Sequence, residues 1–367
     1  MLESALTKEQ HLENERRKKD LIEFIDSGQA ILMVGAGCSA EIYPAWPDFI
    51  ALLKEKALEA DSNFLEDSSD FLPFADKVKN LLGTEKYYSL IYNTFKPTNP
   101  QHFPYHEQLC KLPFKGITTT NYDLILESAL NKVAPAVDLS LHFEGSTATT
   151  IHEFLMSLNA HKSTTRKVAH LHGIYNVADS IVLSEKEYEQ KYGFKVNQPE
   201  DNLYENVAKG MSKEDFKRAL FSYGYEWPLR RKLLWSLLAT RRIVFIGFGM
   251  SDPYFIKMLD EIKTDLSTYY TESHYLVLRI TESKKAKTIA FAKMLKTEYG
   301  IQTVFYLDEE NDYSGLAKFI GQLDDMINPA KPLLSRIKDD ENIPNTGNIK
   351  VTDKLMAIAK NQQGNED

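Results

Sequence analysis

Three polar side chains stand where β-rich segments of the sequence end. Asn121 and Asp123 follow residues 115–120, and His172 stands near the end of the segment 167–173. Because the carboxyl ends of parallel strands meet in one crevice of a doubly wound sheet, we expect these side chains to face one ligand. Imidazole exchanges protons near neutral pH, and amide or carboxylate groups hold water and hydroxyls by hydrogen bonds. The competing interpretation is structural, with Asn121 as a helix cap, Asp123 as a first-turn acid and His172 as a packed histidine.

Two Gly-x-Gly turns follow strongly apolar segments. Residues 30–34 lead into a turn with Gly35 and Gly37, and a similar turn later in the chain holds Gly247 and Gly249. Glycines let the backbone turn sharply and approach an anion, so the exposed amides of such turns suit the pyrophosphate of a dinucleotide. The first turn is neither a P-loop, since no Gly-Lys-Ser/Thr follows, nor a full dinucleotide fingerprint, since its third glycine is missing. Plain strand-to-helix turns are the alternative.

Three residues near these segments have two interpretations each. Trp46 either closes over a ligand or anchors its loop on the core. Asp252 either joins the site or caps a helix over residues 253–263. His170 shares a strand face with His172 by alternation, but no clear set of further ligands accompanies the pair, so a metal site is not indicated.

The composition limits the kind of protein. The chain has 367 residues, 43% of them hydrophobic, and a net charge of -8, which argues against a broad surface for nucleic acid. Cys38 and Cys110 are the only cysteines, so we expect neither a disulfide framework nor a four-cysteine zinc module. The sequence has no leading apolar segment and no run of about 18 apolar residues, which favours a cytoplasmic protein without a membrane span.

Strands alternate with helices along the chain. This order predicts an α/β fold, a Rossmann-like, mostly parallel sheet with helices on both faces and a helical insertion or subdomain. We divide the chain into an N-terminal helix (1–28), a main domain (29–327) with helical segments near 48–110 and 185–240, and a C-terminal tail or docking arm (328–367).

Local signals predict where some elements begin. Thr7 and Gln10 have the spacing of a capping box, and so do Ser184 and Glu187 at the start of a later helix. A short strand is expected over 180–183, directly before that later helix.

The order of four blocks along the chain resembles the sirtuin-like domain of bacterial anti-phage defence proteins. The blocks are Gly35-Ala36-Gly37-Cys38-Ser39, Thr119-Thr120-Asn121-Tyr122-Asp123, His170-Leu171-His172-Gly173 and Ile246-Gly247-Phe248-Gly249-Met250-Ser251-Asp252. The resemblance extends roughly over residues 20–325 and implies that 29–327 is a catalytic domain that binds NAD.

The resemblance also implies roles for single residues. Asn121 and His172 are the implied catalytic residues, Asp123 lies on the nicotinamide side, and the last block lies on the adenosine side. The implied NAD-binding residues are Gly35, Ala36, Gly37, Ser39, Trp46, Asp48, Thr120, Asp123, Gly247, Phe248, Gly249 and Ser251. Asp48 stands in Pro47-Asp48-Phe49-Ile50, which only partly matches the Gly-Ile-Pro-Asp-Phe-Arg stretch of protein deacylases.

The missing zinc module separates this chain from those deacylases. Protein-deacylating sirtuins carry four cysteines between the histidine block and the last glycine block, and here no cysteine follows Cys110. No zinc is expected. The defence relatives lack the module too, and the resemblance implies hydrolysis of NAD to nicotinamide and ADP-ribose, which would deplete NAD in an infected cell. The alternatives are an ADP-ribosyl or acyl transferase and a non-enzymatic subunit that senses NAD or ADP-ribose.

An unregulated NAD hydrolase would kill its host, so we expect gated activity in a homo-oligomer joined to a separately encoded partner. The resemblance suggests a HerA-like ATPase or a short Argonaute protein, and the ATPase is favoured because no Argonaute-contacting domain is apparent. Direct binding of nucleic acid or of a membrane is not expected.

Overall fold

A computed structural model describes most of the main domain. The described residues are 6–133, 142–143, 148–159, 168–193, 212, 227–250, 252–266, 274–308 and 314–329. All but Pro329 belong to one compact unit, Met1–Asn328. Ser251, most of the segment 195–225 and nearly all of the predicted tail lie outside the described residues.

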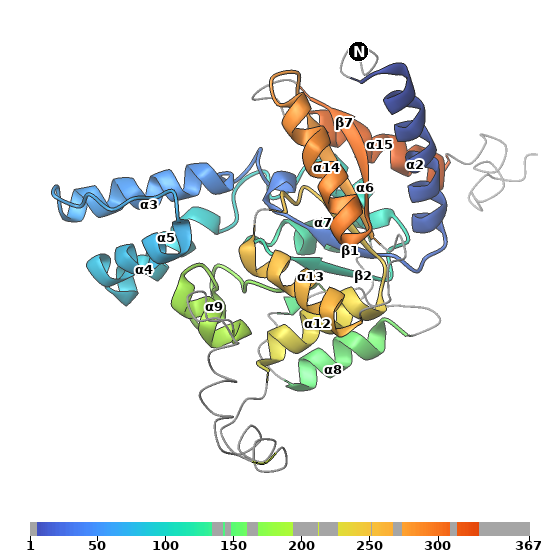
Figure 1. Ribbon diagram of the computed structural model, residues 1–367. Helices are drawn as coiled ribbons and strands as arrows, with labels where there is room; N and C mark the ends of the chain where they lie inside the picture. The colour runs from blue at the N-terminus through green and yellow to red at the C-terminus, as the bar shows by residue number, and fades with distance from the viewer. Residues whose placement is uncertain are drawn as a thin grey trace, which may run out of the picture. The chain divides into compact units, whose positions relative to one another are not determined.

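A parallel sheet of seven strands forms the centre of this unit (Figure 1). Every strand pair is parallel, and the strand order is β3-β4-β2-β1-β5-β6-β7. The strands are β1 (Ile31–Val34), β2 (Gly116–Thr119), β3 (His142–Phe143), β4 (Val168–His170), β5 (Ile243–Ile246), β6 (His274–Ile280) and β7 (Ile301–Leu307). The chain leaves β1 toward β2 and later returns to the other side of β1 with β5, so the carboxyl ends of β1 and β5 form a topological switch point.

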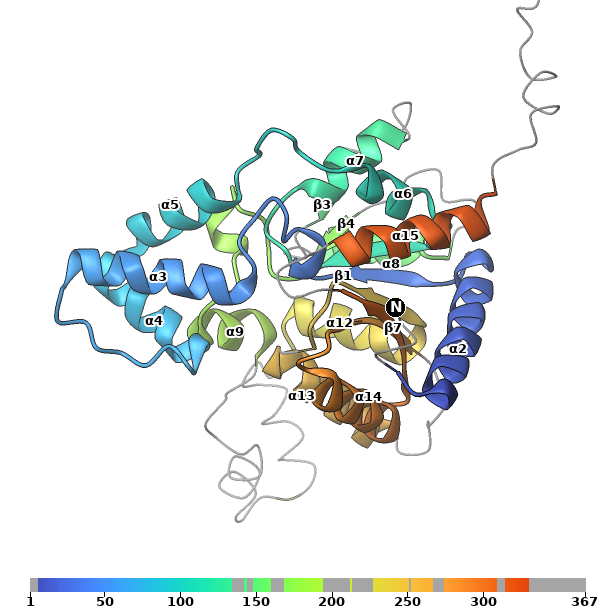
Figure 2. The ribbon, with the colours of Figure 1, turned by 90° about the horizontal axis from the view of Figure 1, so that it is seen from above.

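Helices cover both faces of the sheet because the strands are apolar on both. In β1, Leu32 and Val34 pack into one core cluster, while Ile31 and Met33 pack into another. The first face is covered by α2 (Lys8–Asp26), α6 (Pro104–Lys111), α7 (Ile125–Val133) and α15 (Ser314–Ile327). The second is covered by α8 (Ala148–Ser157), α12 (Leu229–Thr240), α13 (Pro253–Asp265) and α14 (Lys285–Tyr299). Figure 2, seen along the sheet, shows most of these helices on its two sides and confirms the predicted fold class.

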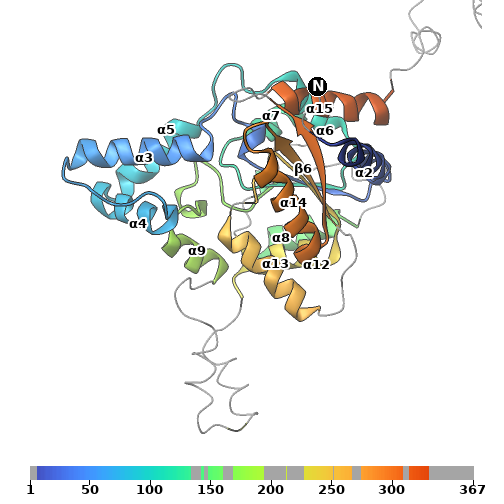
Figure 3. The same cartoon turned by 45° about the horizontal axis from the view of Figure 1, so that its top comes forward.

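A separate group of helices extends beyond the carboxyl edge of the sheet (Figure 3). It consists of α3 (Trp46–Ala60), α4 (Phe71–Leu82), α5 (Thr84–Phe95) and α9 (Glu185–Tyr192). We call these four helices the helical layer. Phe49, Phe74 and Tyr87 form the centre of a third core cluster within it. Lys79 in α4 binds Glu187 in α9 at 2.8 Å, which ties α9 to the rest of the layer.

Helix α2 closes the edge of the sheet beside β7. The Asn14 side chain donates from Nδ2 to Phe305 O at 3.1 Å and accepts from Phe305 N at 2.7 Å. Its amide therefore satisfies the two backbone groups that an edge strand leaves open. The capping box predicted at Thr7 and Gln10 is confirmed at the start of this helix. Among the described helices, none is both long and apolar enough to cross a membrane.

One local prediction is wrong. Residues 181–183 do not form a strand but follow a short 3-10 turn, η2 (Ala178–Ser180). Their backbone binds loops instead of a neighbouring strand, since Val182 N donates to His172 O at 2.9 Å and Val182 O accepts from the Tyr122 hydroxyl at 2.7 Å. The first glycine turn opens into a 3-10 turn, η1 (Ala36–Cys38), and the next α-helix begins at Trp46, close to residue 48, where the helical segments were expected to begin.

Candidate active site

A cavity of about 310 Å³ lies where the helical layer meets the carboxyl ends of β1, β2 and β5. Its lining includes twelve of the fourteen residues predicted for the site, so segments far apart in the sequence do converge on one space. These twelve are Gly35, Ala36, Gly37, Ser39, Trp46, Thr120, Asn121, Asp123, His172, Gly247, Phe248 and Gly249.

The other two predicted residues are not part of this lining. Asp48 is exposed in the first turn of α3, where a carboxylate interacts favourably with the amino end of a helix. Its predicted place beside the ligand is therefore not supported. Ser251 lies outside the described residues.

The two glycine turns touch each other beneath the cavity. Gly37 N donates to Gly247 O at 2.9 Å. A Cβ on Gly35 would lie 2.6 Å from Gly247 O, and one on Gly247, whose φ is +64°, would lie 2.5 Å from Cys38 N. Side chains at Gly35 and Gly247 would therefore collide with backbone, and the contact leaves a floor free of side chains.

The amides of the first turn are mostly engaged within the protein. Those of Gly35, Gly37, Cys38 and Ser39 donate to backbone carbonyls at 2.9 to 3.0 Å. The sequence-based expectation that this turn presents its amides to a pyrophosphate is therefore wrong for these four groups. What the glycines provide is close approach to the backbone rather than a set of free donors.

Helix α6 holds the first turn from the side opposite the cavity. Cys38 O accepts from the Tyr105 hydroxyl at 2.8 Å and lies 2.7 Å from His106 Nε2. Phe103 N donates to His106 Nδ1 at 2.9 Å, so Nε2 carries the hydrogen of the ring. Burial lowers the pKa of His106 to about 4, and the ring stays neutral at physiological pH.

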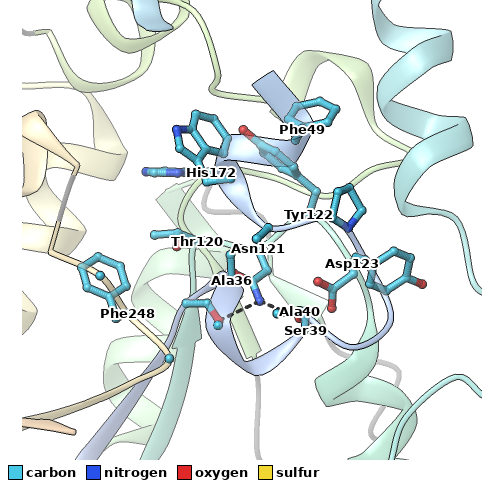
Figure 4. Close-up of a pocket in the computed structure, with 18 of the residues that line it drawn as sticks. Ala36, Ser39, Ala40, Phe49, Thr120, Asn121, Tyr122, Asp123, His172 and Phe248 are labelled. Atoms are coloured by element: carbon cyan, nitrogen blue, oxygen red, sulfur yellow. Dashed lines mark hydrogen bonds between the residues drawn. The ribbon is translucent and has the colours of Figure 1, made fainter. Parts of the chain in front are cut away.

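Asn121 lies at the centre of the cavity, between His172 and Asp123 in the view of Figure 4. Its Nδ2 donates to Gly35 O at 3.2 Å and to Ser39 Oγ at 2.9 Å. Both amide hydrogens are thus committed to the protein, and the carbonyl oxygen Oδ1 is the group left to meet a ligand. These bonds run across to the first glycine turn, so Asn121 is not merely a helix cap.

Asp123 combines a structural bond with a place on the cavity. Its Oδ1 accepts from Ile125 N at 3.1 Å, so Asp123 binds the start of α7 from outside the helix and is not the first-turn acid of the structural interpretation. Burial raises the pKa of Asp123 above its ordinary value, while the bonds from Ile125 and Ser39 partly oppose that shift. Its carboxyl group is thus held on the lining of the cavity.

His172 follows β4 by two residues and contacts Asp252, for which a place in the site was one of two interpretations, and Tyr188, which was not predicted. Its Nε2 lies 3.3 Å from Asp252 Oδ2 and 3.3 Å from the Tyr188 hydroxyl. Burial raises the pKa of Asp252, but the bond and charge of His172 and the bond from Tyr188 outweigh it, and the pKa falls below its ordinary value. Asp252 therefore stays ionised beside the imidazole.

The sequence signals for these two residues differ. Asp252 ends the last glycine block, and the structure shows that it both caps α13 and lines the cavity. An acid directly after a strand-end turn could also have been placed near the histidine. Tyr188 lies within the helix that begins after Ser184, where an aromatic residue is fully explained by packing, so no local signal marks it.

His170 supports the site from below rather than lining it. Its Nδ1 lies 3.0 Å from Asn121 O, and its Nε2 lies 2.6 Å from Glu127 Oε1. Burial lowers the pKa of His170, but the Glu127 carboxylate and the two hydrogen bonds outweigh burial and raise it above its ordinary value. Among the described residues, no group of three or more His, Cys, Asp or Glu side chains is arranged to hold a metal ion.

Aromatic residues of the helical layer form the wall opposite the glycine turns. Trp46 lines the cavity and also packs against Phe71 and Phe49, with ring centroids 5.2 and 6.1 Å apart, so it anchors its loop on the core, and its contact with a ligand stays a prediction. Tyr43 and Phe95 line the same wall and were not predicted. Their spacing in the sequence is that of ordinary core residues, and only the fold brings them together.

Comparisons with known proteins agree with this arrangement. The "Defense-associated sirtuin 2" of Bacillus subtilis is 25% identical over 245 residues, which cover 66% of this chain and 20% of the relative. Two proteins named "NAD(+) hydrolase ThsA" also match. The one from Cytobacillus dafuensis is 24% identical over 261 residues, 71% of this chain and 43% of the relative. The one from Enterococcus faecium is 22% identical over 264 residues, 71% of this chain and 45% of the relative. The chain spans less than half the length of each of these relatives.

A family model described as "SIR2-like domain" matches residues 115–304, which include β2, β4, β5 and β6 together with Asn121 and His172. The matched region is just over half of the 367 residues. By its sequence and by its parallel sheet, the chain belongs to the SIR2-like domain family.

Proposed function

We propose that this chain hydrolyses NAD at the N-glycosidic bond and releases nicotinamide and ADP-ribose. The observation that carries the proposal is that Asn121, Asp123 and His172 line one cavity with the two glycine turns at a topological switch point. Two relatives named NAD(+) hydrolase support the choice of substrate.

The reaction needs precise placement of the substrate and stabilisation of the positive charge on the ribose rather than a strong nucleophile. Nicotinamide departs as a neutral molecule with the electron pair of the C1′–N bond, and positive charge develops on the ribose. Water forms the new bond to C1′ and gives up a proton. In this mechanism His172 accepts the proton, while Asn121 Oδ1 accepts a hydrogen bond from the attacking water or a ribose hydroxyl.

The remaining cavity residues would hold the dinucleotide. Gly35 and Gly247 leave the floor free of side chains, so a phosphate can lie close to the backbone. The aromatic wall around Trp46 offers apolar surface to the nicotinamide ring. Asp123, whose pKa is raised by burial, is suited to hydrogen-bond the carboxamide.

The test is to incubate the purified chain with NAD and to measure nicotinamide and ADP-ribose by chromatography. We expect both products from the wild type and at least a 100-fold loss in folded His172→Ala and Asn121→Ala variants. His102→Ala is the matched control, because His102 pairs with Glu107 away from the cavity. Saturable NAD binding without products would favour a sensor, and ADP-ribose or an acyl group found on a protein would favour a transferase.

We further propose that NAD depletion is the output of an anti-phage defence system, as the name of the Bacillus subtilis relative suggests. Cells that express the wild type should lose NAD after phage infection, and cells that express His172→Ala should keep it. Equal NAD levels in both strains would contradict this role.

Conditional activity fits a homo-oligomer with a separately encoded partner, and we propose a HerA-like ATPase before a short Argonaute protein. The proposal rests on the cost of ungated NAD hydrolysis to the host. Co-expression with the neighbouring gene product, followed by sedimentation and an NAD assay, tests it. Full activity of a lone monomer would refute it.

A further inference from the structure

Asp252 uses its two carboxylate oxygens for two different tasks. Oδ1 accepts from Tyr254 N at 2.9 Å and from Phe255 N at 3.2 Å, which caps α13. Oδ2 accepts from the Tyr188 hydroxyl at 2.9 Å and lies 3.3 Å from His172 Nε2. The cap leaves the carboxylate little freedom to rotate, so Oδ2 is held toward the imidazole.

The hydrogen bonds determine which ring nitrogen of His172 carries the proton. The Tyr188 hydroxyl donates its only hydrogen to Asp252, so its oxygen can only accept. Both oxygens near Nε2 are therefore acceptors. A neutral His172 must place its hydrogen on Nε2, and the lone pair is then on Nδ1.

We infer that Asp252 and Tyr188 are positioning residues that hold His172 as the Nε2–H tautomer and make Nδ1 the proton acceptor of the reaction. The inference rests on the proposed function for its catalytic consequence, but the tautomer itself can be observed without any turnover. When Nδ1 takes a proton, the ring becomes a cation beside the ionised Asp252, which stabilises it.

The surroundings keep Tyr188 in place for this task. Its ring stacks on Tyr254 with centroids 4.1 Å apart and planes at 10°. Tyr254 is in the first turn of α13, the helix that Asp252 caps. The ring of His172 meets the Tyr188 ring edge-on, with centroids 5.3 Å apart. Tyr188, Asp252 and His172 thus form a closed set of contacts from α9, α13 and the loop after β4.

The decisive substitution is Asp252→Asn, because it changes the tautomer and spares the cap. Asparagine is a strong cap, and the amides of Tyr254 and Phe255 need its oxygen, so its NH₂ group must face His172. Nε2–H would then meet a donor, and the ring is expected to move its hydrogen to Nδ1. We expect kcat for nicotinamide release to fall about 10²- to 10⁴-fold, with a much smaller change in KM and in Tm.

Two further variants separate positioning from packing. Tyr188→Phe keeps the stacking on Tyr254 and removes only the hydroxyl, so kcat should fall about 10-fold. Asp252→Asn in a His172→Ala background should cause no further loss, since Asp252 acts only through the imidazole. If the two losses multiply instead, Asp252 acts independently and the inference is wrong.

Nuclear magnetic resonance gives the readout that does not depend on activity. Long-range ¹H–¹⁵N spectra of the full chain with labelled histidine, recorded at alkaline pH and assigned with His172→Gln, report the tautomer directly. We expect Nε2–H in the wild type and Nδ1–H in Asp252→Asn. The same tautomer in both proteins would overturn the inference even if NAD is hydrolysed. If the wild type releases no nicotinamide but Asp252→Asn still changes the tautomer from Nε2–H to Nδ1–H, the proposed function is refuted and the positioning role of Asp252 stands.

Discussion

The buried pair of His170 and Glu127 predicts that His170→Ala destabilises the protein strongly and in a pH-dependent way. Both ring nitrogens of His170 face acceptors, the carbonyl of Asn121 at 3.0 Å and the Glu127 carboxylate at 2.6 Å. A ring that donates from both nitrogens is an imidazolium cation. His170→Ala therefore removes a buried positive charge, and the Glu127 carboxylate stays buried without it.

The magnitude follows from what Glu127 would lose. The side chain of His170 is 0% exposed and that of Glu127 is 8% exposed. Glu127 Oε2 has no hydrogen-bond partner in the described part of the chain, so little else compensates the charge. Breaking a buried ion pair from one side costs about 3–5 kcal/mol. For a domain of this size, that loss corresponds to a fall in Tm of roughly 10 °C.

The pH dependence has a definite sign. The folded-state pKa of His170 is raised, because Glu127 and the Asn121 carbonyl outweigh burial. The contribution of the pair to stability is then fully present below about pH 6.5, the ordinary pKa of histidine, and is lost as the pH rises through the folded-state value. We expect the stability gap between wild type and His170→Ala to be larger at about pH 6 than at about pH 9.

Urea unfolding at the two pH values measures this gap, and His102→Ala is the control. His102 also pairs with a glutamate, Glu107 at 3.1 Å, but their side chains are 16% and 26% exposed. That pair is less buried than the pair of His170 and Glu127, although His102 Nδ1 also lies 2.7 Å from Ser128 Oγ, so its loss should cost less than the loss of His170. The reasoning is refuted if His170→Ala loses no more stability than His102→Ala at about pH 6, or if its loss grows toward about pH 9.

Two further substitutions test the glycine contact and the sheet edge. Gly247→Ala should destabilise the chain and abolish NAD binding measured by calorimetry, because its Cβ would lie 2.5 Å from Cys38 N. Gly83→Ala is its control, since φ is +79° there with no atom within 4 Å, and equal effects of the two would contradict the argument. Asn14→Ala should lower the unfolding free energy by about 3 kcal/mol, because Phe305 N and O lose their partner. An unchanged urea midpoint would exclude that role for Asn14.

The sequence predicted the elements whose signals are local. The strands β6 (His274–Ile280) and β7 (Ile301–Leu307) carry such a signal, because each is an apolar run of β-forming residues between helices. The capping box at Ser184 and Glu187 is confirmed as well, since its hydrogen bonds close within four residues.

The wrong predictions concern segments whose backbone partners are distant in the sequence. Residues 181–183 are apolar and buried, as a strand would be, but Val182 bonds to loops and not to a strand. A short stretch of sequence does not distinguish a buried strand from a buried loop segment of this kind. The same holds for two amides of the first glycine turn, since Gly35 donates to Ile246 and Gly37 donates to Gly247, more than 200 residues later, whereas Cys38 and Ser39 donate within the turn.

The candidate site was predicted only in part, because some of its contacts also join segments that are distant in the sequence. Asn121 and His172 stand near strand ends, where parallel sheets collect their ligands, so topology alone placed them together. Glu127 and Tyr188 lie on helices, and each fits an ordinary helical pattern. Their contacts with the histidines cross elements that the sequence does not bring together, and only the packed structure reveals them.

Residues 181–183, for which a strand was wrongly predicted, also link the two proposed catalytic residues. The loop that carries Asn121 continues into Tyr122, whose hydroxyl donates to Val182 O at 2.7 Å. Val182 N in turn donates to His172 O at 2.9 Å. Tyr122 packs in the core of the helical layer, so these bonds fix the loop to both the sheet and that layer. The spacing between Asn121 and His172 is therefore set largely by backbone carbonyls and a buried tyrosine. Because Phe95 of the aromatic wall packs on Tyr122, with ring centroids 5.3 Å apart, a change at Phe95 should also disturb the spacing of these two residues.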